Sequence, residues 1–514
     1  MAAFASSDPA QCIIKSATPL LTRSYQSTLS QNEATKFDFI RLSGDGEHNT
    51  DITVESDRMA GRSCSYWYNQ SLNKAKQVIR SQSLVVSTHS TIESDLHTSQ
   101  VKCSNVEIMM TMIKGTAGTG ILSLPFAFKN SGLWVGLVLF LSISTVTIHC
   151  MHVVHKCTGL LEKRSRVMVQ SYPDTIEQCF QYGPLRLQRF APFMRMFVNG
   201  LILVIQCGFC SIYIVWVAVN IKRVIDQFWT LSPNVRVYEA VIFVHHNVLP
   251  YVMVKSIKSI AMFSAFANII YLVGLVIIYQ YMLQGLPDSR TRPAWNSWAT
   301  LPMFFGTAIF SFENMCLIVP LRHKIKQQDD FGGWTGVLNL AMVITMAVYT
   351  GMGFYGYLKF GDNVATTITL NLPQDEWLYL SLNLMFATAV FLTVGVQFYV
   401  PVNIIWPAVD RKLSETTSLF RKCAQYITRA SLLAVILLVA VVVPHLDLLM
   451  SFVGSFCGSF LTIILPALLE FITLYEERGL TAIIAAKDTF ILAIGIIGFI
   501  TGSYTSLKDI VNTF

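Results

Sequence analysis

The chain has 514 residues, of which 53% are hydrophobic and only 13% are charged. Soluble globular domains carry about 25% charged residues, so the composition excludes a chain of soluble domains. The formal net charge of +7 does not indicate a nucleic-acid partner, because the lysine and arginine of a membrane protein collect in its cytoplasmic loops. Apolar runs of about 20 residues, the length that crosses a bilayer as a helix, recur after residue 105. We therefore predict an all-α integral membrane protein.

The first 105 residues differ from the rest. They are rich in serine and threonine and contain no apolar run of spanning length. Such a composition is typical of a disordered segment. The N-terminus lacks a basic stretch followed by an apolar one, so no cleaved signal peptide is expected. Residues 1–105 are predicted to form a largely disordered cytoplasmic tail.

The transmembrane domain is predicted to cover residues 106–507 with eleven spans. Lysine and arginine in the alternating loops show a two-to-one bias toward the side of the tail, which predicts a cytoplasmic N-terminus. An odd number of spans then places residues 508–514 on the outer side. The predicted spans are 106–126, 132–157, 193–221, 239–254, 259–283, 300–320, 334–358, 377–402, 426–443, 446–474 and 488–507.

The first span contains an unusual cluster of small residues, Lys-Gly-Thr-Ala-Gly-Thr-Gly over 114–120. Three glycines so close together favour an interruption of the helix. Irregular backbone at membrane depth is tolerated where it lines a cavity, and half-helix N-termini often face anionic groups of a substrate. We expect Thr116, Gly118, Thr119 and Gly120 to bind substrate. The alternative is a small-residue face for close helix packing.

A second interruption is predicted five spans later, in Phe-Gly-Thr-Ala-Ile-Phe-Ser-Phe-Glu over 305–313 with Pro320 beyond it. A charge such as that of Glu313 costs ~2.5 kcal/mol or more inside the membrane, so it must face a cavity, be protonated or be paired. A separation of five spans is typical of an inverted repeat of five helices plus five. Spans 1–5 and 6–10 would form the two halves, and span 11 would be an addition.

Several polar residues are candidates for coupling or gating. Lys114 is the natural partner of Glu313, although such a pair can be purely structural. His149 can titrate in a useful range, but it can also belong to a solvated helix end. Gln397 either lines the path or accompanies a structural break, and Glu470 is a site member or an interfacial residue.

No metal, cofactor or enzymatic site is expected. Cys207 and Cys210 form a single Cys-x-x-Cys pair within a span, and without a second pair this spacing indicates packing rather than metal binding. Nothing in the sequence resembles paired catalytic carboxylates or an activated nucleophile that faces a common cavity. We therefore do not expect an enzyme.

Several stretches resemble the proton-coupled amino acid transporter family, within the amino acid and auxin permease group. The resemblance extends over residues 106–507, and the match in the sixth span is the most specific. The stretches are Lys114-Gly115-x-x-Gly118-Thr119-Gly120 with Leu124-Pro125, Ile148–Met151, Ala267–Ile269, Phe304–Glu313, Ile368–Pro373, Gln397–Pro401 and Pro466–Glu470.

The resemblance implies eleven spans with a cytoplasmic N-terminus, a LeuT-like core with broken helices 1 and 6, and transport of small neutral amino acids such as glycine, alanine and proline. It also exposes two departures. Thr111 occupies the position of a family histidine linked to proton coupling, and Asn314-Met315-Cys316 replaces a glycine-rich stretch. Whether transport is coupled to H⁺ is therefore left open.

The leading hypothesis is alternating-access transport of a small neutral amino acid. Gly118–Gly120 would hold the carboxylate, and Ser311, Phe312 and Glu313 would contact the amino group. Glu313 is also a candidate to bind a coupling proton, because burial favours a neutral carboxyl group. The alternative is an amino-acid-sensing transceptor that signals through the tail. The host membrane is either the plasma membrane or a lysosomal or vacuolar membrane.

Overall fold

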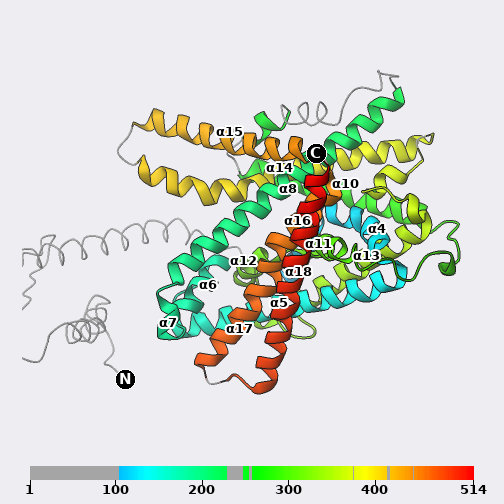
Figure 1. Ribbon diagram of the computed structural model, residues 1–514. Helices are drawn as coiled ribbons and strands as arrows, with labels where there is room; N and C mark the ends of the chain where they lie inside the picture. The colour runs from blue at the N-terminus through cyan, green and yellow to red at the C-terminus, as the bar shows by residue number, and fades with distance from the viewer. Residues whose placement is uncertain are drawn as a thin grey trace, which may run out of the picture. The chain divides into compact units, whose positions relative to one another are not determined.

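The computed structural model describes residues 103–228, 247–253, 257–373, 375–413, 417–443, 445–477 and 479–513. Figure 1 shows that these residues form helices and their connections. The only β-type pairing among them is an isolated bridge between Cys103 and Ile325. Apart from its last three residues, the predicted tail lies outside the described residues. So does most of the predicted fourth span, of which residues 247–253 are described and mainly helical.

The α-helices follow one another in the order of the predicted spans, with short helices in the connections. Span 10 contains two π-helical segments, η6 (Gly454–Gly458) and η7 (Phe460–Ile464). The α-helices are α3 (Asn105–Thr116), α4 (Thr119–Ser131), α5 (Leu133–Ser165), α6 (Tyr172–Gln181), α7 (Leu185–Gln188), α8 (Ala191–Phe228), α10 (Ile257–Met282), α11 (Leu301–Phe312), α12 (Ile318–Lys324), α13 (Val337–Phe360), α14 (Trp377–Lys412), α15 (Ser418–Val442), α16 (Leu446–Val453), α17 (Leu465–Glu476) and α18 (Ala482–Asn512).

Within the described ranges, eight helical segments are long and apolar enough to cross a membrane. Two further predicted spans correspond to the interrupted pair α3–α4 and to α10, whose apolar described part is Phe266–Met282. The prediction of an all-α multi-pass membrane protein is confirmed.

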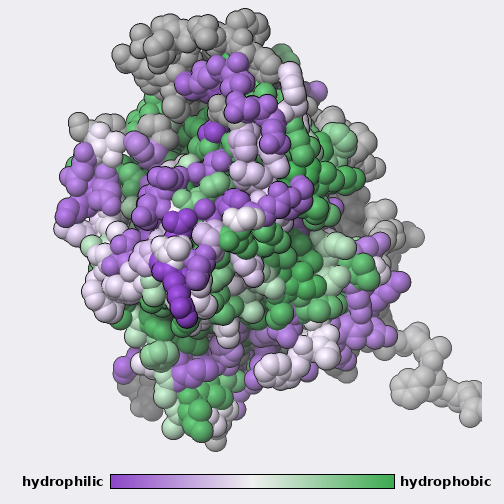
Figure 2. Space-filling model, turned by 90° about the vertical axis from the view of Figure 1, so that its right-hand side faces the viewer, coloured by the Kyte–Doolittle hydropathy of each residue, from purple (hydrophilic) through white to green (hydrophobic). Residues whose placement is uncertain are grey.

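The last helix, α18, illustrates how a span divides its surface between lipid and protein. Phe490, Ile497 and Tyr504 recur every seventh residue and are 67%, 61% and 68% exposed, as expected for a face that meets hydrocarbon. Gly498 lies on the buried face, where an added Cβ would come 2.1 Å from the ring of Phe305 in α11. The absence of a side chain therefore allows α18 to pack directly on span 6. Figure 2 shows large hydrophobic areas on one face of the molecule.

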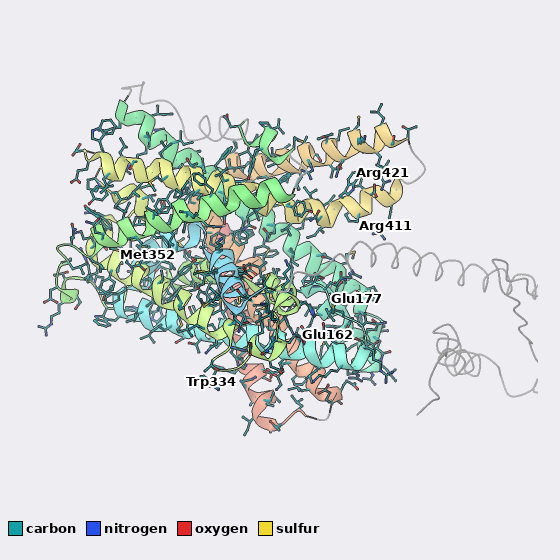
Figure 3. All side chains as sticks on the ribbon, turned by 180° about the vertical axis from the view of Figure 1, so that it is seen from behind. Glu162, Glu177, Trp334, Met352, Arg411 and Arg421 are labelled. Atoms are coloured by element: carbon teal, nitrogen blue, oxygen red, sulfur yellow. The ribbon has the colours of Figure 1, made fainter. Side chains whose placement is uncertain are left out.

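Connections that the topology places on the side of the tail gather toward one end of the helices. In Figure 3, Glu162 near the end of α5 lies on the right of the view, as do Arg411 and Arg421 on either side of the α14–α15 connection. Met352, in the middle of α13, lies on the left. Arg421 also forms an ion pair with Asp410 across its own connection.

The end of span 6 is anchored at this same end of the bundle. Glu162 of α5 forms an ion pair with Arg322 and lies 3.0 Å from Nε2 of His323, both in α12. The backbone N–H of Cys103 donates to the carbonyl of Lys324 over 2.8 Å. The short helix α12 is thus held by α5 and by the segment that enters α3.

Candidate functional site

The first predicted interruption is present. Helix α3 ends at Thr116 and α4 begins at Thr119, and Ala117 and Gly118 between them have extended backbone conformations. Gly118 occupies the N-cap position of α4, where no side chain caps the helix. The N–H groups in the first turn of α4 therefore have no side-chain acceptor, and the positive end of the helix dipole points into the gap.

The second predicted interruption is also present, although its sequence is quite different. Helix α11 ends at Phe312, Glu313 has extended φ and ψ of −70° and 121°, and the chain resumes as a 3-10 turn over Met315–Leu317 before α12. The backbone N–H of Met315 donates to Oε1 of Glu313 over 3.3 Å. No glycine is present here, so the polar side chains replace the hydrogen bonds that the helix loses.

The two interruptions are in direct contact. The side-chain amide of Asn314 donates to the Met112 carbonyl over 3.1 Å and to Oγ1 of Thr116 over 3.0 Å. A Cβ at Gly120 would lie 2.6 Å from Cα of Ser311, closer than real Cβ contacts allow. Glycine at 120 is thus required for the close approach of α4 and α11.

Tyrosine hydroxyl groups cap the carbonyl groups of the first interruption. Tyr349 of α13 donates to the carbonyl of Thr116 over 2.7 Å, and Tyr271 of α10 donates to that of Gly118 over 2.6 Å. Tyr349 is 3% exposed and Tyr271 is 8% exposed. An unpaired carbonyl at this depth would be costly. The tyrosines therefore stabilise the unwound backbone, whereas the N–H groups at the start of α4 have no side-chain cap.

A cavity of about 580 Å³ lies against both interruptions. Among the described residues that line it, Glu313 is the only charged one, and amide and hydroxyl groups from α8 and α14 supply about half of the other polar side chains. The lining includes Thr116, Gly118, Thr119, Gly120, Asn199, Gln206, Phe209, Tyr213, Phe310, Ser311, Glu313, Asn314, Gln397 and Asn403.

The cavity extends from the interruptions toward one end of the bundle. Its walls include the last residues of α3, the first residues of α6, and Pro320 in α12. The first residues of α6 and Pro320 lie next to connections on the side of the tail, whereas the last residues of α3 lie at the interruption itself. In the opposite direction the rings of Phe209 and Phe310 approach to a centroid distance of 4.9 Å, and Gly120 packs against Ser311. The cavity is therefore bounded by packed side chains at its other end.

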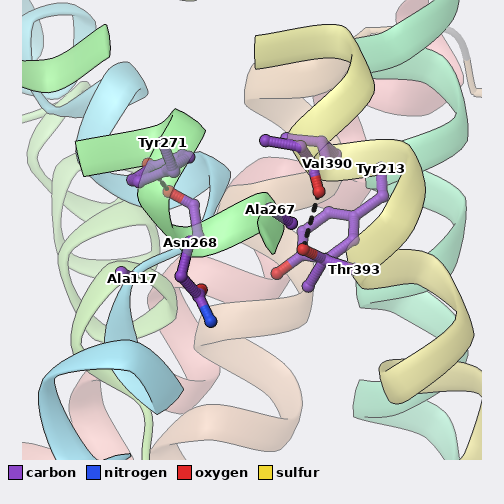
Figure 4. Close-up of a pocket in the computed structure, with 9 residues that line it drawn as sticks. Ala117, Tyr213, Ala267, Asn268, Tyr271, Val390 and Thr393 are labelled. Carbon is purple, nitrogen blue, oxygen red and sulfur yellow. Dashed lines mark hydrogen bonds between the residues drawn. The ribbon is translucent and has the colours of Figure 1, made fainter. Parts of the chain in front are cut away.

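A smaller pocket lies on the far side of Ala117, between α8, α10 and α14. In Figure 4 the amide of Asn268 and the ring of Tyr271 project from α10, and Tyr213 and Thr393 approach from the opposite wall. Thr393 donates its hydroxyl hydrogen to the carbonyl of Ala389 over 2.8 Å. The interrupted backbone of span 1 is thus surrounded by polar groups on two sides.

Most of the predicted binding residues line the large cavity, but two predictions need correction. The described ion pairs do not include the expected one between Lys114 and Glu313: Lys114 is exposed, because it lies on the outer face of α3. Phe312 is fully buried and does not line the cavity, since its ring packs in edge-to-face geometry with Phe140 and Tyr349. Thr111 is exposed and donates to the carbonyl of Glu107 within its own helix.

The remaining coupling candidates separate into two places. Gln397 of α14 lines the cavity. His149 and Glu470 do not, and both instead contact Lys487 at the beginning of α18. The sequence analysis did not single out Lys487 as a member of this group.

Sequence reasoning also missed the contribution of α8. Asn199, Gln206 and Tyr213 line the cavity, and the next residue in the same register, Asn220, accepts a hydrogen bond from Thr369 over 3.0 Å. These four polar residues recur at intervals of seven, and between the first and the last of them Ser211 is the only other hydroxyl, amide or charged side chain. Such a stripe lies along one helix face. It was the available signal that span 3 forms part of the site.

Comparison with known proteins agrees with this arrangement of helices. The model of a family described as transmembrane amino acid transporter protein matches residues 102–508. The proton-coupled amino acid transporter-like protein pathetic of Drosophila melanogaster is 32% identical over 409 residues, which cover 79% of this chain and 85% of that protein. The probable amino acid transporter skat-1 of Caenorhabditis elegans is 26% identical over 418 residues, with coverage of 79% and 90%.

Proposed function

Because this chain belongs to the family of transmembrane amino acid transporters, we propose that it carries small neutral amino acids by alternating access. The family and the relatives make amino acid transport across a membrane the function of the chain and exclude an enzyme assignment. The proposal adds the substrate class, the binding mode and the transport cycle.

The proposed binding mode rests on one observation: a helix N-terminus and a carboxyl group, which suit opposite charges, line the same cavity. The uncapped N-terminus of α4 offers backbone N–H groups and a positive dipole end, which suit a carboxylate. Glu313 at the end of α11 offers a negative group, which suits an ammonium. A zwitterion satisfies both groups at once. Gly118–Gly120 hold the carboxylate, and Ser311 and Glu313 hold the amino group.

The composition of the cavity wall favours a neutral and small side chain. No lysine, arginine or histidine is among the described lining residues, so a second negative charge on the substrate would have no counter-charge. Space is limited next to the interruption, where a Cβ at Gly118 would lie 2.8 Å from the hydroxyl of Tyr213. Large side chains would have to extend away from this point into the wider part of the cavity.

Alternating access requires that the same site open to each side of the membrane in turn. The cavity extends toward the end of the bundle that bears the entry to α3, whereas the contact between Phe209 and Phe310 bounds it in the other direction. Opening to the second side would separate these rings and close the walls formed by α3, α6 and α12. The interruptions in spans 1 and 6 serve as hinges for this movement.

Glu313 is the one carboxyl group of the cavity wall among the described residues, and it can take up a proton when no substrate ammonium is bound. Thr111 cannot serve that purpose because a hydroxyl group does not titrate near neutral pH. We further place residues 1–105 in the cytoplasm as a tail and residues 508–514 on the outer side, on the basis of the charge bias of the loops. The plasma membrane and lysosomal or vacuolar membranes remain the two candidate locations.

The test is uptake into proteoliposomes that contain the purified full-length protein. Labelled glycine, alanine and proline should be taken up, and labelled lysine and glutamate should not. Alaninamide and N-acetylalanine should fail to compete with alanine, because each lacks one of the two charged groups. The absence of uptake for every neutral amino acid would overturn the proposal.

A pair of variants tests the role of Glu313 directly. Glu313→Gln should raise the KM for alanine about 10-fold or more, since a charge-assisted hydrogen bond contributes about 1.5–3 kcal/mol. Glu477→Gln, at the exposed residue that follows the last turn of α17, should transport like the wild type. An unchanged KM for Glu313→Gln would show that the ammonium binds elsewhere.

A further inference from the structure

A second group of charged side chains lies outside the cavity, where α5, α17 and α18 meet. Lys487 of α18 donates hydrogen bonds to Nε2 of His149 in α5 over 2.9 Å and to Oε2 of Glu470 in α17 over 2.6 Å. Its ammonium nitrogen is also 3.2 Å from Oδ1 of Asp488. We call these four residues the Lys487 cluster. None of them lines the cavity.

The carboxyl group of Asp488 is the least satisfied member of the cluster. Asp488 is 2% exposed, its Oδ1 has only the ion pair with Lys487, and its Oδ2 has no donor among the described residues. Buried acceptors without a donor are costly. Asp488 and Glu470 both contact the Lys487 ammonium nitrogen, at 3.2 Å and 2.6 Å, so the two carboxyl groups lie close to each other. A proton on either carboxyl group would be donated to the other and would satisfy both.

The charge balance of the Lys487 cluster also favours one added proton. Glu470 and Asp488 contribute two negative charges and Lys487 contributes one positive charge. The imidazole of His149 accepts a hydrogen bond at Nε2, so it is neutral in this geometry. The net charge is therefore −1, and a buried net charge is unfavourable.

The neighbouring titratable groups do not cancel this charge in their neutral forms. His152 and the thiols of Cys150 and Cys157 are the further titratable groups of α5 that interact electrostatically with members of the cluster. All three residues belong to α5, on the same side of the cluster. One proton on the carboxyl pair makes the cluster neutral.

We propose that Glu470 and Asp488 form a proton-binding site separate from the substrate cavity, and that this site binds the coupling ion of the transport cycle. The proton adds to a carboxylate oxygen of one residue, and the new O–H group donates to the other carboxylate. No other bond forms or breaks, and the proton leaves from the same oxygen. Lys487 and His149 position the pair by holding Glu470 against α5 and α18.

The Lys487 cluster has a structural route to the broken helices. Protonation removes negative charge that holds the Lys487 ammonium, and so it weakens the link between α5, α17 and α18. Helix α18 packs on α11 through Gly498 and Phe305, and α11 ends at Glu313 in the cavity. A change in the position of α18 therefore shifts α11, the first half of span 6. This inference rests on the proposed transport function.

The experiment uses the full-length protein in proteoliposomes and compares two assays. Counterflow exchange of alanine at equal pH reports on the substrate site alone, and accumulation driven by an imposed pH gradient reports on coupling. Asp488→Asn should reduce gradient-driven accumulation about 5-fold or more, as expected when a coupling free energy of typically 1–3 kcal/mol is lost, and should still support exchange. Asp488→Glu should restore the response to the gradient.

Further variants keep the test decisive. Glu470→Gln should behave like Asp488→Asn, and the double variant should lose no more than either single one, because the two carboxyl groups act as a unit. If Asp488→Asn fails to fold, the single variant Glu470→Gln tests the same site. Glu477→Gln on the exposed end of α17 is the matched control and should retain both activities.

Each contrary outcome has a distinct meaning. Normal gradient-driven accumulation by both Asp488→Asn and Glu470→Gln would overturn the proton-binding site. So would the loss of exchange in both, which would indicate a purely structural role. A wild-type protein that exchanges alanine but ignores the pH gradient would overturn the coupling site and leave the transport proposal intact. A wild type without exchange would overturn the proposed function itself.

Discussion

The interruptions in spans 1 and 6 meet at one cavity, but they are held open in different ways. In span 1 the carbonyl groups of Thr116 and Gly118 are capped by tyrosines from distant helices. In span 6 the interruption is stabilised from within, since Glu313 accepts the N–H of Met315 and Asn314 reaches across to the Met112 carbonyl. The first interruption depends on its surroundings, whereas the second also supports its neighbour.

This difference assigns different chemistry to the two sides of the site. Span 1 presents backbone N–H groups, so its function depends on the absence of Cβ atoms and on the shape of the unwound segment. Span 6 presents side chains, so its charge can be altered while its backbone is preserved. Steric substitutions should therefore be most damaging in span 1, and polar substitutions should be most informative in span 6.

The largest effect is expected for Gly120→Ala. The new Cβ would lie 2.6 Å from Cα of Ser311 and 2.8 Å from its hydroxyl oxygen, so α4 and α11 must move apart. A displacement of about 1 Å in a binding site can lower activity about 100-fold. We expect alanine uptake to fall by about that factor at equal amounts of reconstituted protein.

Gly200→Ala is the matched control, because a Cβ at Gly200 of α8 meets no atom within 4 Å. It should transport at the wild-type rate. Wild-type uptake by Gly120→Ala would mean that the close contact between the two interruptions is unimportant for transport. Span 1 would then not be more sensitive than span 6 to steric substitutions.

A smaller effect is expected for Asn314→Ala, which removes the link that span 6 makes to span 1. Two hydrogen bonds to Met112 and Thr116 are lost, and a buried carbonyl loses its side-chain donor. Such losses cost about 1–3 kcal/mol, which corresponds to roughly 10-fold in KM for alanine. Concentration-dependent uptake measures this change.

Asn339→Ala serves as the control, because the side-chain amide of Asn339 makes an exposed hydrogen bond to the Trp334 carbonyl and Asn339 does not line the cavity. Its KM should stay within about twofold of the wild type, as is usual for surface substitutions. If both asparagine variants have the same KM, the second interruption does not support the first.

The external support of span 1 is tested by Tyr349→Phe, which removes one hydroxyl group and keeps the ring. The Thr116 carbonyl then lacks the tyrosine donor. A loss of about 1 kcal/mol, equivalent to about fivefold in KM, is expected from a hydrogen bond of this kind. Tyr271→Phe should have a similar effect at Gly118.

Tyr355→Phe on the exposed face of α13 should leave the KM unchanged. Because both capping tyrosines act on one unwound segment, the double variant Tyr271→Phe, Tyr349→Phe should deviate from the product of the single effects. Strictly multiplicative effects would mean that the two carbonyl groups are supported independently.

Much of the fold was predictable because apolar runs of spanning length and glycine clusters are local signals. The Lys-Gly-Thr-Ala-Gly-Thr-Gly stretch predicted the gap at Ala117 and Gly118, and Glu313 within an apolar run predicted the second gap. Both follow from the cost of unsatisfied or charged groups in hydrocarbon. The sequence alone thus indicated which spans form the site.

Side-chain partners were not predictable in the same way, because they depend on the rotation of each helix about its axis. Lys114 is close to Glu313 in the expected topology, yet it points outward from α3. Phe312 is adjacent to Glu313 in sequence, but it projects toward Phe140 of α5. The contact of Lys487 with His149 joins residues 338 positions apart, and no single-sequence pattern indicates such a pairing.

The smallest expected effect concerns Thr119, the first residue of α4. Its hydroxyl is buried at the cavity wall and has no hydrogen-bond partner among the described residues. Thr119→Val keeps the shape and removes only this unpaired group, so the free energy of unfolding should not fall. If a substrate carboxylate supplies the missing partner, the KM for alanine should rise about threefold, as for the loss of one modest hydrogen bond. A thermal-shift assay with and without alanine separates the two effects: the Tm of the free protein should be unchanged or higher, and the stabilisation by alanine should decrease. A lower Tm without substrate, or an unchanged response to alanine, would place the carboxylate away from the start of α4 and would shift the recognition of both charged groups to span 6.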